Sequence, residues 1–156
     1  SDCLAKASFP IFLLPAIVFV IAAFLSFSTG TAWGTFSILI PIIAPVAYAL
    51  AQQLLTVSLS ATLAGSVFGD NCSPISDTTI LSSAGTECNH IEHVTTQLPY
   101  ALTVAGCCFV GYIVAGLSGS NMVLTLSVSF ACLVIAIKFL HSYYGRKTAG
   151  RSGQRG

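Results

Sequence analysis

The chain has 156 residues, of which 54% are hydrophobic and only 7% are charged, and its formal net charge is +1. An average soluble domain carries about 25% charged residues, so a soluble fold of this composition could not cover its surface. No Asp, Glu, Lys or Arg occurs in residues 7–69 or 93–137. Charge-free runs of that length are typical of segments that cross a bilayer, at about 20 residues per helix. The composition predicts an all-α integral membrane protein and excludes soluble enzymes, nucleic-acid binders and disulfide-rich secreted scaffolds.

The two ends of the chain differ from its apolar middle. The sequence opens on Ser1, with neither an initiator Met nor the basic start of a signal peptide, so we expect it to begin inside a longer protein. Residues 145–156 hold four of the six basic residues and no acidic one, in a Gly/Ser-rich context that cannot form a core. We predict a transmembrane domain over residues 1–144 and a disordered basic tail over residues 145–156, which the positive-inside rule places in the cytoplasm.

The first two apolar segments, residues 9–27 and 36–50, contain prolines and are separated by the polar but uncharged residues 28–35. Two arrangements fit this pattern. Either two full helices cross the membrane, or the segments form a re-entrant hairpin whose tip stops within it. The uncharged tip and the short second arm favour the hairpin. Non-helical backbone at that depth is tolerated only where it is buried in protein or lines a water-filled cavity.

The next segment, residues 54–84, is too long for one straight span and contains Gly69 and Pro74. A discontinuous transmembrane helix is the simplest interpretation, with halves at residues 54–68 and 77–83. Residues 85–97 then form a cytoplasmic loop. The spacing of Cys88, His90 and His93 in this loop matches no established zinc pattern, so a polar loop is preferred over a zinc site.

The last two apolar segments are residues 98–117 and 122–140, joined by a short polar turn. Their lengths predict an antiparallel pair of spanning helices. Three glycines on the first of them, Gly106, Gly111 and Gly116, indicate close helix packing.

Asp70 and Asp77 are the two acidic residues placed inside the apolar region. An ionisable side chain in a membrane segment costs about 2.5–3.5 kcal/mol or more, so it persists where it faces a cavity, a partner or an ion. Oxygen-bearing side chains surround this pair: Asn71, Ser73, Ser76, Thr78 and Thr79. Together with free carbonyls at the end of a half-helix, they suit Na⁺. The alternative is that both aspartates cap helix ends, with Asp77 as N-cap of the second half-helix.

A carboxylate in such a site can also exchange its cation for a proton. Burial raises the pKa of a carboxylic acid and a bound cation lowers it, so Na⁺ loading and H⁺ release exclude each other. The polar break at residues 28–35 is predicted to line the opposite side of the same cavity. Its hydroxyl-bearing candidates are Ser28, Thr29, Thr31 and Thr35. An ordinary turn at the membrane interface is the alternative for this break.

In three stretches, residues 27–42, 69–83 and 90–101, the chain resembles the NhaC-type Na⁺/H⁺ antiporter family of the wider ion-transporter group. The most specific of these is the run Gly-Asp-x-Cys-Ser-Pro-Ile-Ser-Asp-Thr-Thr that begins at Gly69. The resemblance implies a multi-pass transporter of the bacterial inner membrane, built from two inverted repeats that each hold a hairpin and a broken helix. This chain would be the C-terminal repeat. Asp70, Ser73, Ser76, Asp77 and Thr78 would be its ion-site residues.

The resemblance implies Na⁺/H⁺ antiport, with no enzymatic reaction and no cofactor beyond the transported ions. The expected partners are membrane lipid, Na⁺, H⁺ and the missing N-terminal repeat, and a homodimer is left open. Two alternatives to Na⁺/H⁺ exchange stay open. One is Na⁺- or H⁺-coupled exchange of organic acids or amino acids, as in malate/lactate antiport, and the other is a non-transporting fragment.

Overall fold

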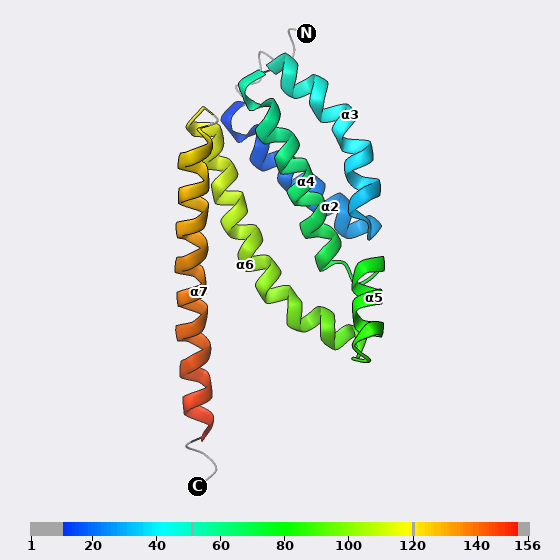
Figure 1. The fold of residues 1–156 in the computed structure, drawn as a ribbon, viewed down its shortest axis with the longest axis vertical. Helices are drawn as coiled ribbons and strands as arrows, with labels where there is room; N and C mark the ends of the chain where they lie inside the picture. The colour runs from blue at the N-terminus through cyan, green and yellow to red at the C-terminus, as the bar shows by residue number, and fades with distance from the viewer. Residues whose placement is uncertain (1–10, 51, 120, 153–156) are drawn as a thin grey trace.

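The structure, a computed structural model, describes residues 11–50, 52–119 and 121–152, and the regular elements in them are all helical (Figure 1). Two 3-10 turns, η1 (Ile11–Leu13) and η2 (Gln52–Leu54), precede the helices α2 (Leu14–Thr29) and α4 (Leu55–Cys72). The other helices are α3 (Ala32–Leu50), α5 (Asp77–Gly85), α6 (His90–Leu117) and α7 (Met122–Ser152). The all-helical prediction is confirmed, whereas the inverted repeat and the re-entrant path stay predictions.

Helices α2 and α3 form the predicted helix–turn–helix around Gly30. This glycine ends α2 in the left-handed conformation with φ 68°, as is common at helix ends. Helix α3 begins at Ala32 and contains Pro41 and Pro45 in its interior, so the prediction of a short second arm starting at residue 36 is wrong. The Thr35 hydroxyl donates to the Thr31 carbonyl at 2.8 Å, and a polar residue that bonds its own helix in this way needs no water.

Two of the described helices, α3 and α6, are long and apolar enough to cross a membrane by length and composition. Helix α2 and residues 123–138 of α7 are shorter apolar helices. The 19 residues of α3 remove one of the two reasons to prefer a re-entrant hairpin over two full spans at residues 9–50, namely the short second arm. The path of this segment through the membrane therefore stays open.

Helix α4 lies at the centre of the fold and packs along α2, with α3 and α6 on its flanks (Figure 1). A Cβ atom on Gly69 would lie 2.8 Å from the Phe27 amide nitrogen and would overlap the Ala23 carbonyl, and one on Gly65 would overlap the Phe19 carbonyl. The two glycines, four residues apart, let the backbones of α2 and α4 approach closely, as small residues do in membrane helix pairs.

The predicted break in the segment over residues 54–84 is confirmed, but it begins later than expected. Helix α4 continues through Gly69 to Cys72, and α5 begins at Asp77. Ser73 has an extended conformation, with ψ 126°, as the residue before a proline prefers. Pro74 therefore ends α4, because glycine inside a helix is tolerated at a cost of about 1 kcal/mol.

Helices α6 and α7 lie side by side and run antiparallel, as predicted (Figure 1). Gly111 faces Ser129 of α7 and Gly116 faces the backbone of Phe12, which confirms close packing at both glycines, whereas a Cβ atom on Gly106 would meet no heavy atom within 4 Å. Helix α6 starts at His90, eight residues before the predicted span, so most of the predicted loop over residues 85–97 is helical.

The C-terminal segment also departs from the prediction. Helix α7 continues to Ser152, so residues 145–152 are helical where the sequence predicts a disordered tail. Arg, Lys and Ala are favourable helix residues, and extending a helix already nucleated by an apolar segment costs little. Residues 153–156 of the predicted tail lie outside the described residues.

Candidate ion-binding site

Asp70, Ser76 and Thr78 meet across the break between α4 and α5. The Ser76 hydroxyl donates to Asp70 Oδ1 at 2.7 Å, and the Thr78 hydroxyl donates to Asp70 Oδ2 at 3.2 Å. The two hydroxyl oxygens lie 2.8 Å apart. Ser76 is fully buried and Asp70 is half-buried. The last turn of α4 and the first turn of α5 thus place one carboxylate and two hydroxyls in a closed cluster.

The cluster explains why α5 lacks a side-chain cap. Ser76 is the N-cap residue of α5, yet its side chain makes no capping hydrogen bond, because its hydroxyl turns to Asp70 instead. Asp77 is the first helical residue, not the N-cap, so the capping alternative for Asp77 is wrong. A carboxylate in the first turn still interacts favourably with the positive end of the helix dipole.

The other predicted residues near the break are dispersed around it. Ser73 is buried and its hydroxyl accepts from the Ile75 amide at 3.4 Å, and Thr79 is buried in α5. The Asp77 side chain is exposed and does not join the Asp70 cluster. Asn71 is exposed and lies in a different part of the molecule, described below. The structure therefore brings together three of the seven predicted residues of this segment.

The polar residues of the other break form a small network of their own. The Thr29 and Thr35 hydroxyls lie 3.1 Å apart, and Thr35 is buried. The Thr31 hydroxyl accepts from the Gly34 amide at 3.4 Å. Ser28 is exposed and its hydroxyl donates to the Phe24 carbonyl at 2.9 Å within α2. These four candidates mainly bond their own turn.

The two breaks nevertheless meet, through Gly30 and Ile75. A Cβ atom on Gly30 would lie 2.9 Å from the carbonyl oxygen of Ile75 and 2.9 Å from its Cγ1. Gly30 is the turn between α2 and α3, and Ile75 is inside the break between α4 and α5. This contact places the two polar breaks next to each other, whereas a cavity that both breaks line stays a prediction.

The Gly30 contact predicts a substitution effect. Gly30→Ala should weaken folding by more than the roughly 1–2 kcal/mol that a left-handed conformation costs a residue with a Cβ atom, because the new methyl group also meets Ile75 backbone. Gly119→Ala is the matched control, since Gly119 has φ 61° and open space around it. Thermal unfolding of both variants measures the difference, and equal losses would mean that the Gly30–Ile75 contact is absent.

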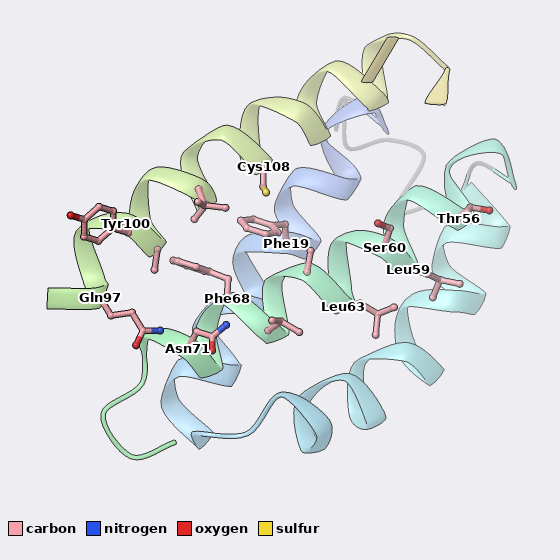
Figure 2. Close-up of a pocket in the computed structure, with 15 residues that line it drawn as sticks. Phe19, Thr56, Leu59, Ser60, Leu63, Phe68, Asn71, Gln97, Tyr100 and Cys108 are labelled. Carbon is pink, nitrogen blue, oxygen red and sulfur yellow. The ribbon is translucent and has the colours of Figure 1, made fainter. Parts of the chain in front are cut away.

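An apolar groove lies on another face of α4, between α4 and α6 (Figure 2). It has a volume of about 950 Å³ and is lined mainly by apolar side chains, with Phe19 and Phe68 in its middle. Asn71 and Gln97 lie together at one end of the groove (Figure 2). Asp70, Ser76 and Thr78 do not line it, so the carboxylate cluster and the apolar groove are separate features.

His90 contacts the break, which the sequence did not predict. Its Nε2 atom lies 2.6 Å from the Pro74 carbonyl oxygen and its Nδ1 atom lies 3.0 Å from the Ser83 hydroxyl. Within the described residues, no three His, Cys, Asp or Glu side chains gather as a zinc site requires. Only the start of α6 had a local signal, the pair Asn89 and Glu92, which is a helix-start pattern, and the Asn89 side chain does accept from the Ile91 amide at 3.1 Å.

The described residues contain two helices able to cross a bilayer and a carboxylate cluster at a helix break, which are features of a secondary transporter. The family model described as "Na+/H+ antiporter family" matches residues 2–117. The chain belongs to this family.

Curated relatives support the same class. A Haemophilus influenzae protein of uncharacterised function is 52% identical over 86% of this chain and 26% of its own length. The malate-2H⁺/Na⁺-lactate antiporter of Bacillus subtilis is 32% identical over 68% of this chain and 23% of its own length. An uncharacterised Na⁺/H⁺ antiporter of H. influenzae is 36% identical over 57% of this chain and 19% of its own length. The chain thus spans about a quarter or less of these relatives, and no solved structure matches it significantly.

Proposed function

We propose that this chain carries the carboxylate at which Na⁺ and H⁺ compete in a Na⁺/H⁺ antiporter. The observation that carries the proposal is a count of hydrogens. Asp70, Ser76 and Thr78 make three short oxygen–oxygen contacts, but the two hydroxyls supply only two hydrogens. A third hydrogen, from a proton on Asp70, completes the three contacts, and a metal cation bound among these oxygen atoms can take the place of that proton.

A proton on Asp70 closes the cluster as a ring. The protonated Oδ2 then donates to Thr78, Thr78 donates to Ser76, and Ser76 donates to Oδ1. When the proton leaves, the carboxylate and the two hydroxyl oxygens are hard ligands of the kind that Na⁺ takes. The carbonyl groups at the C-terminal end of α4 add the negative end of the helix dipole. One carboxylate therefore accommodates either ion but not both.

The rest of the proposed transporter lies outside this chain. We propose that the longer protein resides in the bacterial inner membrane, with the basic C-terminal segment on the cytoplasmic side. The relatives are roughly three times as long as this chain, and a partner repeat in that additional sequence would cover the second side of the cluster.

The experiment that tests the proposal is Na⁺-driven proton movement in vesicles that contain the intact protein. Ser76→Ala removes a hydrogen bond to a charged group, so we expect the KM for Na⁺ to rise about tenfold or more. Ser82→Ala is the matched control, because Ser82 is exposed on α5 and takes no part in the cluster. A Ser76 variant that behaves like the Ser82 variant would contradict a role of the cluster in Na⁺ binding.

Exchange of an organic acid is the second candidate function. It is favoured by the similarity to the B. subtilis protein, whose name states that it exchanges malate and lactate together with H⁺ and Na⁺. Counterflow of labelled lactate or malate in the same vesicles distinguishes the two functions, since simple Na⁺/H⁺ exchange moves neither acid.

A further inference from the structure

We propose that His90 is a positioning residue that fixes the geometry of the Asp70 cluster from a distance, by holding the break and α5 against the start of α6. This role rests on the proposed function for its effect on Na⁺. His90 lies outside the cluster: its ring touches neither Asp70 nor the two hydroxyls, and its two hydrogen bonds go to Pro74 and Ser83.

The imidazole ring connects three parts of the fold. Its Nε2 atom lies 2.6 Å from the carbonyl oxygen of Pro74 in the break, and its Nδ1 atom lies 3.0 Å from the hydroxyl of Ser83 in α5. His90 itself is the first residue of α6. Ser83 is 4% exposed, and its hydroxyl also bonds the Ile80 carbonyl at 2.9 Å. Both ring nitrogens are engaged, so the ring has one orientation.

The Pro74 carbonyl determines which ring nitrogen of His90 carries the hydrogen. The Pro74 carbonyl can only accept, so Nε2 must carry the hydrogen of this bond. Pro74 has no N–H group, and the break that it creates interrupts the hydrogen bonds between α4 and α5. Backbone hydrogen bonds from Ser73 to Asp70 at 3.0 Å and from Ser76 to Ser73 at 3.3 Å hold the two ends of the break. The bond from His90 adds a restraint at the Pro74 carbonyl, in the stretch of backbone between them.

The position of this stretch decides whether the cluster can form. Pro74 lies between Asp70 at the end of α4 and Ser76 at the start of α5, and the first turn of α5 also carries Thr78. If α5 turns relative to α4, the two hydroxyls leave the carboxylate. His90 holds α5 at Ser83, near its other end, and holds the break at Pro74. The ring thus selects one orientation of α5.

A residue that selects an orientation alters apparent affinity rather than the transport step. When only a fraction of the molecules has the binding-competent geometry, the apparent dissociation constant rises by the inverse of that fraction. Saturating Na⁺ restores the competent population. Loss of His90 should therefore raise the KM for Na⁺ and leave the maximal rate nearly unchanged.

Two variants test the hydrogen bond to Pro74, because the amide nitrogen of Gln reaches the place of Nε2 and can donate there, whereas the shorter Asn side chain does not reach Pro74. In the intact protein we expect His90→Ala and His90→Asn to raise the KM for Na⁺ about fivefold to tenfold. His90→Gln keeps the donor to Pro74 and should stay within about twofold of the unmodified protein. His93→Gln, one turn further along α6, is the matched control and should change nothing.

Hydrogen exchange of the α5 amides, measured without Na⁺, gives a readout that does not depend on transport. Exchange should be about fivefold to tenfold faster in His90→Ala and should return to its original rate in His90→Gln. If α5 responds in this way while neither variant nor unmodified protein responds to Na⁺, the positioning role stands and the proposed function fails. Unchanged exchange in His90→Ala overturns the positioning role. So does a lower maximal rate at unchanged KM, or a His90→Gln variant that behaves like His90→Ala.

Discussion

Replacing Asp70 with Asn is expected to abolish Na⁺-driven proton movement while leaving the helices in place. The Asn amide has nearly the shape of the protonated carboxylic acid, and its N–H group can donate to Thr78 as the acid would. The variant therefore resembles the proton-loaded cluster, whose contacts to Ser76 and Thr78 hold the break together. It can neither release a proton nor offer a negative charge to Na⁺.

The expected loss can be given a size. Asp70 is half-buried, and losing the charged partner of such hydrogen bonds costs about 1.5–3 kcal/mol, which is a factor of about 10 to 100 in the affinity for Na⁺. Proton movement in vesicles on addition of Na⁺ measures this loss, and size-exclusion chromatography of the purified variant checks its folding.

Asp77→Asn is the control that separates the loss of the Asp70 carboxylate from the loss of any carboxylate near the break. Asp77 is exposed at the first turn of α5 and lies outside the Asp70 cluster. We expect this variant to keep most of the activity, with a KM change below about tenfold, because surface charge interactions are weak. If both variants left proton movement unchanged, the assignment of the cluster to ion exchange would fail. A larger loss in Asp77→Asn than in Asp70→Asn would move the site to α5.

The break between α4 and α5 shows how much a local pattern can predict. Gly69 and Pro74 both interrupt a helical pattern, and the sequence alone favoured an end at the glycine. Proline is the stronger signal, because it constrains the residue before it, and Ser73 is indeed extended. The start of α6 at His90 was likewise available from Asn89 and Glu92. The end of α4 and the start of α6 are both determined by interactions between residues a few positions apart. The polarity of single residues does not reveal such interactions.

Which of the candidate residues contact Asp70 depends on the three-dimensional arrangement of the helices, which the spacing of residues in the sequence does not determine. The polarity of residues 70–79 predicted seven oxygen-bearing candidates, but only the angle between α4 and α5 selects Ser76 and Thr78 as partners of Asp70. Asn71 is next to Asp70 in the sequence, yet it belongs to the groove between α4 and α6 (Figure 2). The role of His90 depends on the return of α6 to the break, 16 residues after Pro74. Tertiary contacts of this kind have no local signal.

Gly69→Ala is expected to destabilise the fold, because α2 and α4 touch at this glycine. A Cβ atom there would lie 2.8 Å from the Phe27 amide nitrogen and 2.8 Å from Ser26 Cβ, and it would overlap the Ala23 carbonyl. Two of these three neighbours are backbone atoms, which move only if helix α2 moves. Overpacking of this kind costs about 1–3 kcal/mol. Thermal unfolding of the intact protein in detergent measures the loss.

Gly106→Ala is the matched control for this substitution. Gly106 also lies inside a helix, but a Cβ atom on it would have no heavy atom within 4 Å, so the change should be neutral or should stabilise α6 by up to about 1 kcal/mol. A Gly69 variant as stable as the Gly106 variant would contradict the close contact of α2 and α4. The Gly69 substitution should also raise the KM for Na⁺. Helix α2 ends at Gly30, which rests on Ile75 in the break, so a displaced α2 removes a support from the cluster that Asp70 anchors.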